Sequence, residues 1–449
     1  MSWVEGVGMD FVITTVAGTP NEIIFNDFFN VQNINIVGRS NLLYPHLRVM
    51  KARFGAKVQN NIGLIGHSRG GEAVVRAAKD ILTLPPSIVP PDLKNINAII
   101  SLAPTDLWDE ENLIQNIPYF VLYGSKDGDV SGMITRRQAG PNKISGSGGF
   151  SLYDRAINTK EKTMAFVYGA THNGFITDNH DYFDTSVVLE PEANQQVISK
   201  AYVNAFFRMH LKSEIIWKSI FSENRRPGSV PTKDIYLQYT SPDKVVISNF
   251  NGISSSSFTS LISHDLGFIV KKTEFNLRGT WPPSDFTKRE DPYSPHFLDG
   301  MYVEVPISGG KLSVNIPSSK KDVTAYTHLS FRICYISGKY KNSPRDLDVV
   351  LHTSYNDLSD LSIELKDTST TIKNVKTTKK IPFPDKRKNV TMSNWEDNEN
   401  LTKSAFITIR IPLTEFIGVD LSNLKEISFV FPSLPSKVYL NIDDIEFTQ

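Results

Sequence analysis

The chain has 449 residues, of which 40% are apolar, and its 48 basic and 48 acidic residues give zero formal net charge. This length predicts two or three domains with sizeable cores, and the charge balance argues against nucleic acid or an anionic membrane surface as a partner. Cys334 is the only cysteine, which excludes an intramolecular disulfide and paired-cysteine metal sites.

The N-terminus has no basic segment followed by an apolar run, and no apolar stretch approaches the roughly 20 residues that span a bilayer. We therefore expect a soluble chain without a membrane span or signal peptide as it stands. Its localisation stays unknown, because a start at an internal methionine of a longer gene would also remove an export signal.

Up to about residue 222, short apolar runs alternate with helical patterns. Apolar runs predict strands at Met9–Val16, Ile34–Gly38, Asn61–Gly66, Ile96–Leu102, Tyr119–Tyr123 and Thr163–Tyr168, and helical spacing appears at Glu72–Leu82 and Gln195–Leu211. Nearly continuous apolar strands alternating with helices indicate an α/β fold, with a parallel sheet covered on both faces.

Beyond this half, apolar residues recur at every second position, the period of a β-strand. The polar stretch Ser222–Pro231 indicates a linker, and Ser254–Ser257 indicates a loop. Alternating segments follow at Lys244–Phe250, Tyr302–Ile307, Leu312–Ile316, Leu329–Tyr335, Leu347–His352, Phe406–Ile411 and Val438–Phe447. They predict an antiparallel β-sandwich. The predicted domains are residues 1–222 and 235–449, joined by a linker at 223–234.

The sharpest motif is Gly66-His-Ser-Arg-Gly-Gly71, between a predicted strand and a predicted helix. A serine on such a turn has a strained backbone that lifts its hydroxyl above the sheet, and small residues are needed two positions before and after it. The motif therefore predicts Ser68 as a nucleophile, against the alternative of an ordinary serine in a glycine-rich turn.

A serine nucleophile needs a base and an acid that orients the base. Two later strands end just before Asp127 and His172, where strand ends face Ser68 across the sheet edge. We predict His172 as the base and Asp127 as the acid, with Asp129 as the alternative acid. His67 adjoins the nucleophile, but its side chain is expected to point away from Ser68.

These residues carry a family resemblance. The segments concerned are Arg39–Leu47, Gly66–Val74, Gly124–Val130, Ser151–Ala156, Phe206–Leu211 and the loop around His172. Over about residues 30–215 the chain resembles dienelactone-hydrolase-like, chlorophyllase-like and polyester-hydrolase-like enzymes of the α/β-hydrolase superfamily. The resemblance implies ester hydrolysis without a cofactor, through an acyl-enzyme on Ser68, with the backbone N–H of Arg69 as one oxyanion donor.

The chain departs from this pattern at its start. Only 67 residues precede Ser68, where about 100 are expected, and no glycine-rich loop for a second oxyanion donor is visible. The first strands therefore look shortened or missing. Losing one oxyanion donor typically costs about 2.7–4 kcal/mol of transition-state stabilisation.

Tryptophans mark two candidate binding surfaces. Trp108 follows a strand at the edge where substrates bind, so it is either an acyl-pocket wall or a cover for a helix edge. Val438–Phe447 loosely resembles the last strand of jelly-roll, carbohydrate-binding-like modules. Trp281 and Trp395 are then either sugar platforms, giving a carbohydrate contact, or packing residues.

The leading hypothesis is a serine carboxylic-ester hydrolase with an appended β-sandwich, acting on a small or polymeric ester. The same triad also suits a peptidase or lipase. The non-enzyme alternative is a binding protein whose hydrolase half is catalytically impaired. The sequence leaves the acyl group and the oligomeric state open.

Overall fold

The chain forms two compact units, the first running to Thr240 and the second starting at Ser241. The structure is a computed structural model. It describes residues 12–13, 28–55, 61–106, 114, 116–125, 127, 130, 134–135, 145–146, 149–156, 160–175, 191–231, 235–274, 299–335, 361–368, 375–378, 406–434 and 437–449.

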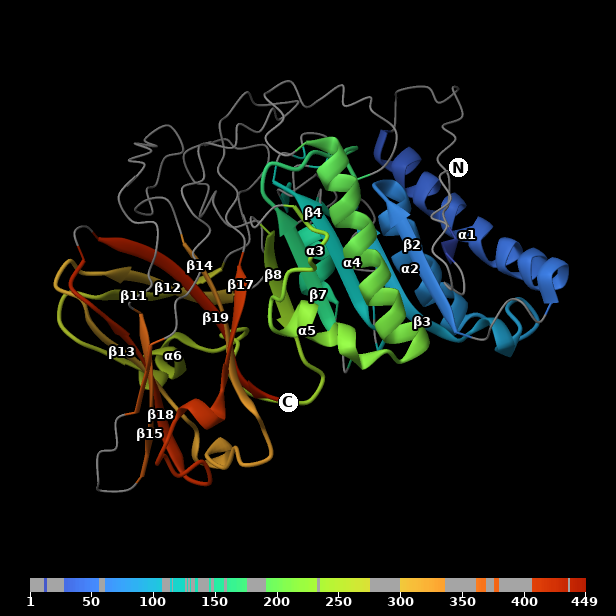
Figure 1. Cartoon of the computed structure of the whole chain (residues 1–449). Helices are drawn as coiled ribbons and strands as arrows, with labels where there is room; N and C mark the ends of the chain where they lie inside the picture. Colours follow the sequence, from blue (N-terminus) through green and yellow to red (C-terminus); the bar gives the residue numbers. More distant parts are fainter. Residues whose placement is uncertain are drawn as a thin grey trace. The chain divides into compact units, whose positions relative to one another are not determined.

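The first unit is built on a six-stranded sheet in the order β1-β2-β3-β4-β7-β8 (Figure 1). Its strands are β1 (Val12–Ile13), β2 (Ile62–His67), β3 (Ile96–Leu102), β4 (Tyr119–Gly124), β7 (Lys162–Val167) and β8 (Ile235–Thr240). The helices are α1 (Phe28–Phe54), α2 (Arg69–Thr83), α3 (Gly149–Arg155), α4 (Glu192–Lys212) and α5 (Lys218–Ser222), and β5 (Ile134–Thr135) pairs with β6 (Ser145–Gly146). The five strands β1, β2, β3, β4 and β7 run parallel.

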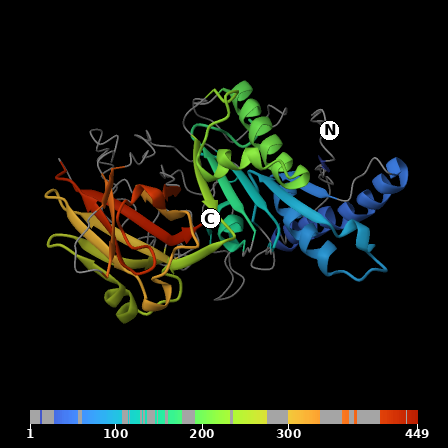
Figure 2. The same ribbon diagram turned by 60° about the horizontal axis from the view of Figure 1, so that its bottom comes forward.

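Helices cover both faces of this sheet, as the continuous apolar strands predict (Figure 2). Ile100 and Leu122 belong to the core cluster that contains Phe206 of α4. The neighbouring Ser101 points to the other face, where its hydroxyl donates to the carbonyl of Gly71 in α2 at 2.8 Å. The prediction of a parallel sheet between helical layers is confirmed for these five strands, and β8 adds one antiparallel strand at the edge.

Two predictions for the first half are wrong. Ile34–Gly38 lies inside α1 and is not a strand. The reason is a longer helical pattern, in which Ile36, Leu43 and Leu47 are fully or nearly buried. Five apolar-rich residues by themselves do not distinguish strand from helix. The hydroxyl of Ser40 fastens α1 to α2 by donating to the carbonyl of Ala73 at 3.0 Å.

The second error concerns the boundary between the halves. Ile235–Thr240 was expected to open the sandwich, but it pairs antiparallel with β7 as the edge strand of the first sheet. The supposed linker also packs on this unit, because Val230 joins Phe221 in the core cluster. The first unit therefore extends to Thr240.

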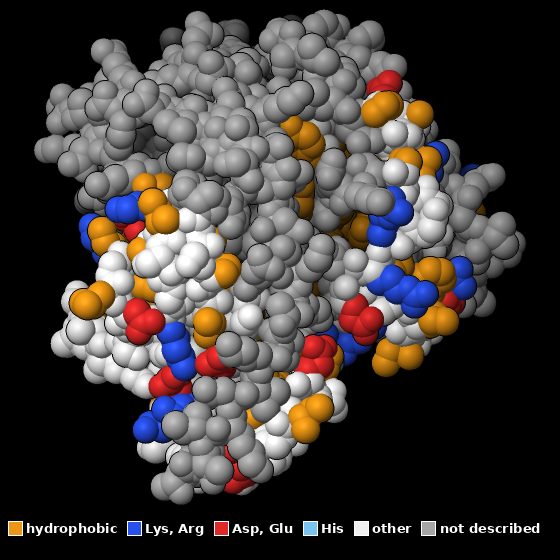
Figure 3. Space-filling model, turned by 60° about the vertical axis from the view of Figure 1, so that its left-hand side comes forward, with side chains coloured by type: hydrophobic (Ala, Val, Ile, Leu, Met, Phe, Trp, Pro, Cys, Tyr) orange, Lys and Arg blue, Asp and Glu red, His pale blue; other side chains and the backbone are white. Residues whose placement is uncertain are grey.

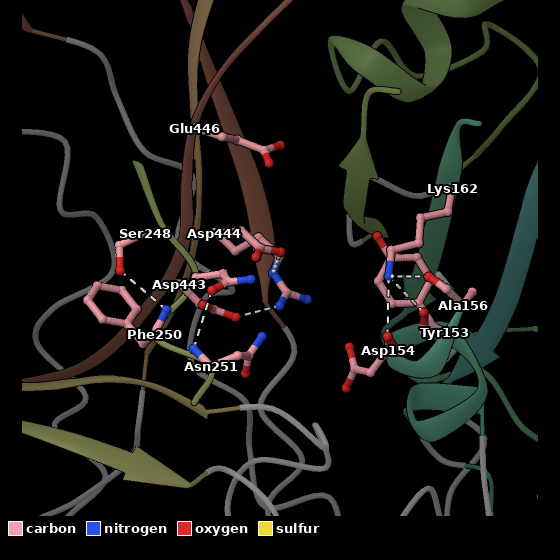
Figure 4. A network of polar contacts seen from close by, with 12 residues as sticks. Tyr153, Asp154, Ala156, Lys162, Ser248, Phe250, Asn251, Asp443, Asp444 and Glu446 are labelled. Carbon is pink, nitrogen blue, oxygen red and sulfur yellow. Dashed lines mark hydrogen bonds and ion pairs between the residues drawn. The ribbon is translucent and has the colours of Figure 1, made fainter. Parts of the chain in front are cut away.

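A lysine at the start of β7 fixes the end of α3 (Figure 4). The ammonium of Lys162 donates to the carbonyls of Tyr153 at 3.0 Å and Ala156 at 3.2 Å, and it lies 4.6 Å from the ring centroid of Tyr153. A cation is favourable at a helix C-terminus, where carbonyls lack helical partners. This contact holds α3 in place relative to β7.

The second unit is a β-sandwich, as predicted. One sheet has the order β10-β13-β18-β15-β16, and the other has β11-β12-β19-β14-β17 with β9 also paired to β19. The strands are β9 (Lys244–Ser248), β10 (Ile262–His264), β11 (Ile269–Glu274), β12 (Asp299–Val305), β13 (Gly310–Asn315), β14 (His328–Tyr335), β15 (Ser362–Asp367), β16 (Val375–Thr378), β17 (Ile407–Pro412), β18 (Leu424–Phe431) and β19 (Val438–Thr448). The rings of Phe331 and Phe429, one from each sheet, meet edge to face at 5.1 Å between centroids.

The serine run begins a helix, contrary to the predicted loop. Helix α6 covers Ser255–Leu261, and the side chain of Ser254 accepts a hydrogen bond from the backbone N–H of Ser257 at 3.1 Å. Serine is a preferred N-cap, which explains a helix start in a polar run. The predicted strand Leu347–His352 lies outside the described residues.

Buried charges tie β14 to β19 in the sandwich. Arg332 pairs with Asp443 at 2.5 Å and with Asp444 at 2.9 Å, and Figure 4 shows both carboxylates on one strand. Burial, followed by the charge of Asp444, raises the pKa of Asp443. Burial likewise raises the pKa of Glu446 to about 7.

On the face in Figure 3 the described acidic and basic side chains are interspersed.

None of the described helices combines the length and the apolar character needed to cross a bilayer.

Candidate active site

Ser68 occupies a strained turn between β2 and α2. It has φ 56° and ψ −126°, and a positive φ is uncommon for any residue other than glycine. Its N–H donates to the carbonyl of Leu102 at 2.9 Å, and its own carbonyl accepts from the N–H of Thr105 at 3.2 Å. The end of β3 therefore holds the turn in place from the side.

Glycine is required at the position two residues before Ser68. A Cβ on Gly66 would lie 2.0 Å from the carbonyl oxygen of Gly70, a distance that real Cβ atoms essentially never show. A Cβ on Gly71 would lie 2.8 Å from Cβ of Pro104. The glycines of the motif thus permit the tight approach between strand and helix that a nucleophile turn needs.

The predicted base and acid come together at the ends of β7 and β4. Nδ1 of His172 lies 2.8 Å from Oδ2 of Asp127, and both side chains are nearly or fully buried. A carboxylate only accepts, so Nδ1–H of His172 is the donor and Nε2 is left to accept a proton. Oδ1 of Asp127 accepts from the N–H of Val130 at 2.7 Å, which orients the carboxylate. The alternative acid, Asp129, lies outside the described residues.

His67 joins the nucleophile turn to the histidine turn. Its Nε2 lies 2.9 Å from the backbone carbonyl oxygen of His172, and the two imidazole centroids are 4.6 Å apart at 48°. Burial, followed by the charge of His172, lowers the pKa of His67 to about 3. Reasoning from the sequence gave His67 no role, and only its position beside Ser68 hinted at one.

Two more side chains hold the turn that carries His172. Oε1 of Gln195, fully buried on α4, accepts from the N–H of Thr171 at 3.0 Å. The hydroxyl of Ser125 accepts from the N–H of Gly169 at 2.8 Å. Neither residue was singled out in the sequence, because Gln195 looked like an ordinary helix position and Ser125 like a loop residue.

Buried polar contacts surround the end of β3, where the N–H of Thr105 bonds to the nucleophile turn. Arg155 of α3 makes a two-pronged ion pair with Asp106 just after β3, at 2.6 and 2.7 Å. Burial acts to lower the pKa of Arg155, but the charge and hydrogen bonds of Asp106 raise it above its usual value. The hydroxyl of Thr105 donates to Oε2 of Glu72, which is fully buried, at 2.7 Å. These contacts fix the chain at the end of β3.

The remaining predicted site residues are less defined. Arg69 is the first residue of α2, where the helix supplies no carbonyl acceptor for the N–H group. Its role as an oxyanion donor stays a prediction. Trp108, Trp281 and Trp395 lie outside the described residues. Within the described part of the chain, no three His, Cys, Asp or Glu side chains are grouped to hold a metal ion.

Comparisons with known proteins give only low-scoring matches to solved structures. No protein-family model matches the chain, and no curated protein matches it. Among solved structures, it is similar to the family 11 carbohydrate-binding module of a cellulosomal cellulase of Clostridium thermocellum, with 12% identity and a TM-score of 0.26 over 46% of this chain and 94% of that one. It is also similar to a xylan-binding domain from Paenibacillus barcinonensis, with 8% identity and a TM-score of 0.24 over 46% and 95% of the two chains. Likeness at this level carries no argument about ligands.

Proposed function

We propose that the first unit is a serine carboxylic-ester hydrolase of the α/β-hydrolase type. The observation that carries the proposal is the buried hydrogen bond between His172 and Asp127, at strand ends next to the strained turn of Ser68. A serine nucleophile, a histidine base and an aspartate that orients the base are the groups that nucleophilic acyl transfer needs.

In the proposed reaction, the hydroxyl of Ser68 attacks the ester carbonyl while Nε2 of His172 takes its proton. The alcohol leaves with that proton, and water then hydrolyses the acyl-enzyme by the same route. Asp127 keeps His172 in the required tautomer and stabilises the imidazolium. The N–H of Arg69 is the proposed donor to the oxyanion.

The test is labelling of the full chain with a fluorophosphonate probe, together with turnover of p-nitrophenyl acetate and butyrate. We expect both signals in wild type and neither in Ser68→Ala, while the exposed Ser87→Ala serves as the matched control and keeps both. A well-folded wild type with neither signal would contradict the proposal and favour the binding-protein alternative. Turnover of anilide or long-chain esters alone would point to the peptidase or lipase alternative.

We further propose a carbohydrate contact on the second unit. A groove of about 420 Å³ lies between β9, α6 and β13, within the size range of small-molecule sites. Its polar lining consists of Ser248, Asn249, Ser257, Ser260, Asn315 and Lys320. The lining contains no carboxylate, and amides and hydroxyls both donate and accept, which suits the hydroxyls of a neutral saccharide.

Affinity electrophoresis of the full chain in gels with neutral soluble polysaccharides tests this contact. We expect retardation in wild type that falls at least tenfold in association constant for Asn249→Ala combined with Asn315→Ala. Ile417→Ala, at an exposed side chain outside the groove, should bind like wild type. Equal retardation of all three proteins would place sugar binding elsewhere, and no retardation would refute it for the polysaccharides used.

A further inference from the structure

We propose that His67 is a positioning residue for His172, acting as a neutral donor that fixes the backbone of the base. This inference rests on the proposed hydrolase function, and it assigns a role to a residue outside the triad. Its basis is the contact between the nucleophile turn and the histidine turn, which lie 105 positions apart in the chain.

The hydrogen bond determines the tautomer of His67. A backbone carbonyl oxygen can only accept, so Nε2 of His67, 2.9 Å from the carbonyl of His172, must carry the hydrogen. A neutral imidazole has one N–H, which leaves Nδ1 of His67 unprotonated. Burial and the neighbouring His172 keep the ring neutral, since they lower the pKa of His67 to about 3.

Neutrality matters because His172 becomes positively charged during the proposed reaction. A protonated His67, with its ring centroid 4.6 Å from that of His172, would repel the imidazolium. Asp127 is the other charged group that acts on His67, and it favours the protonated ring more weakly than burial opposes it. His67 therefore supports the base without competing for its proton.

His67 also restrains the position of His172. Asp127 holds the ring of His172 through Nδ1, and Gln195 holds the preceding residue from α4. His67 supplies the only one of these three restraints that comes from the chain segment carrying Ser68. His67 therefore helps to set the distance between the base and the nucleophile. The rate of acyl transfer depends steeply on this distance.

Substitutions with different donor positions separate this role from simple packing. In glutamine, Nε2 stands as many bonds from Cβ as Nε2 of histidine, whereas the nitrogen of asparagine stands one bond nearer. We expect His67→Gln to keep kcat within about fivefold. His67→Asn and His67→Leu should lower kcat about a hundredfold with KM nearly unchanged, since misplacement of about 1 Å can cost this much. The exposed His46→Asn is the control.

Selective ¹⁵N-histidine labelling provides a readout that needs no activity. In Ser68→Ala, His67 should show the neutral Nε2–H tautomer from pH 5 to 8, with its signal identified by loss in His67→Asn. Titration of His67 near pH 6.5, or wild-type kcat in both His67→Asn and His67→Leu, would overturn the inference. A wild type that neither labels nor turns over esters would instead refute the hydrolase function, and the tautomer would still report on the contact.

Discussion

Asp127→Asn is expected to lower kcat for p-nitrophenyl butyrate by about 10⁴-fold, the loss typical when the acid of such a triad becomes an amide. Oδ1 of the new asparagine would keep the hydrogen bond from the N–H of Val130, so its NH₂ group would face His172. Nδ1 of His172 would then accept instead of donate, and Nε2 would carry the hydrogen. A base in this tautomer cannot take the proton of Ser68.

Steady-state kinetics with circular dichroism checks this result. KM and the folded spectrum should change little, because the side chain keeps its shape and one of its hydrogen bonds. Asp129→Asn is the matched control, since Asp129 is the alternative acid two positions further along the chain, and it should stay within about tenfold of wild type. A large loss in Asp129→Asn with activity retained in Asp127→Asn would reverse the assignment.

Arg155→Met should destabilise the first unit by about 3–5 kcal/mol, the usual cost of removing one partner from a buried ion pair. Asp106 is fully buried, and its carboxylate takes both hydrogen bonds from the guanidinium of Arg155. Methionine fills a similar volume but removes both of these charge-assisted hydrogen bonds from the buried carboxylate. The same pair also links α3 to the end of β3, so we expect the loss of stability to extend to the nucleophile turn.

Hydrogen exchange measured by mass spectrometry on the full chain resolves the effect by unit. Amides of β3 and β4 should exchange faster in Arg155→Met, while those of β13 and β18 serve as the internal reference. Adding Asp106→Leu should restore most of the stability, because an apolar pair often replaces a buried ion pair at little cost. Arg76→Met, which breaks an i,i+4 pair with the partly exposed Asp80 on α2, should cost less than Arg155→Met. Equal losses of stability in Arg155→Met and Arg76→Met would contradict the stabilising role assigned to the pair of Arg155 and Asp106.

Consecutive residues were sufficient to predict the centre of the first unit. The strands β2, β3, β4 and β7 and the helices α2 and α4 each carry their own apolar period, so no distant partner is needed to recognise them. Because parallel strands end at a common edge, the residues that follow β4 and β7 were expected to meet there. Asp127 and His172 do meet, whereas the catalytic role of Ser68 stays a prediction.

Only the tertiary structure decided features whose partners are remote in the chain. Ile235–Thr240 has a strand-like composition that suits either unit, and its hydrogen bonds to β7 settle the choice. Arg155 lies 49 positions from Asp106, and His67 lies 105 positions from His172. The spacing of apolar residues predicts which face of a helix or strand is buried. It does not predict which polar side chain from another element will contact that face. The tertiary structure was therefore needed to find the ion pair between Arg155 and Asp106 and the contact between His67 and His172.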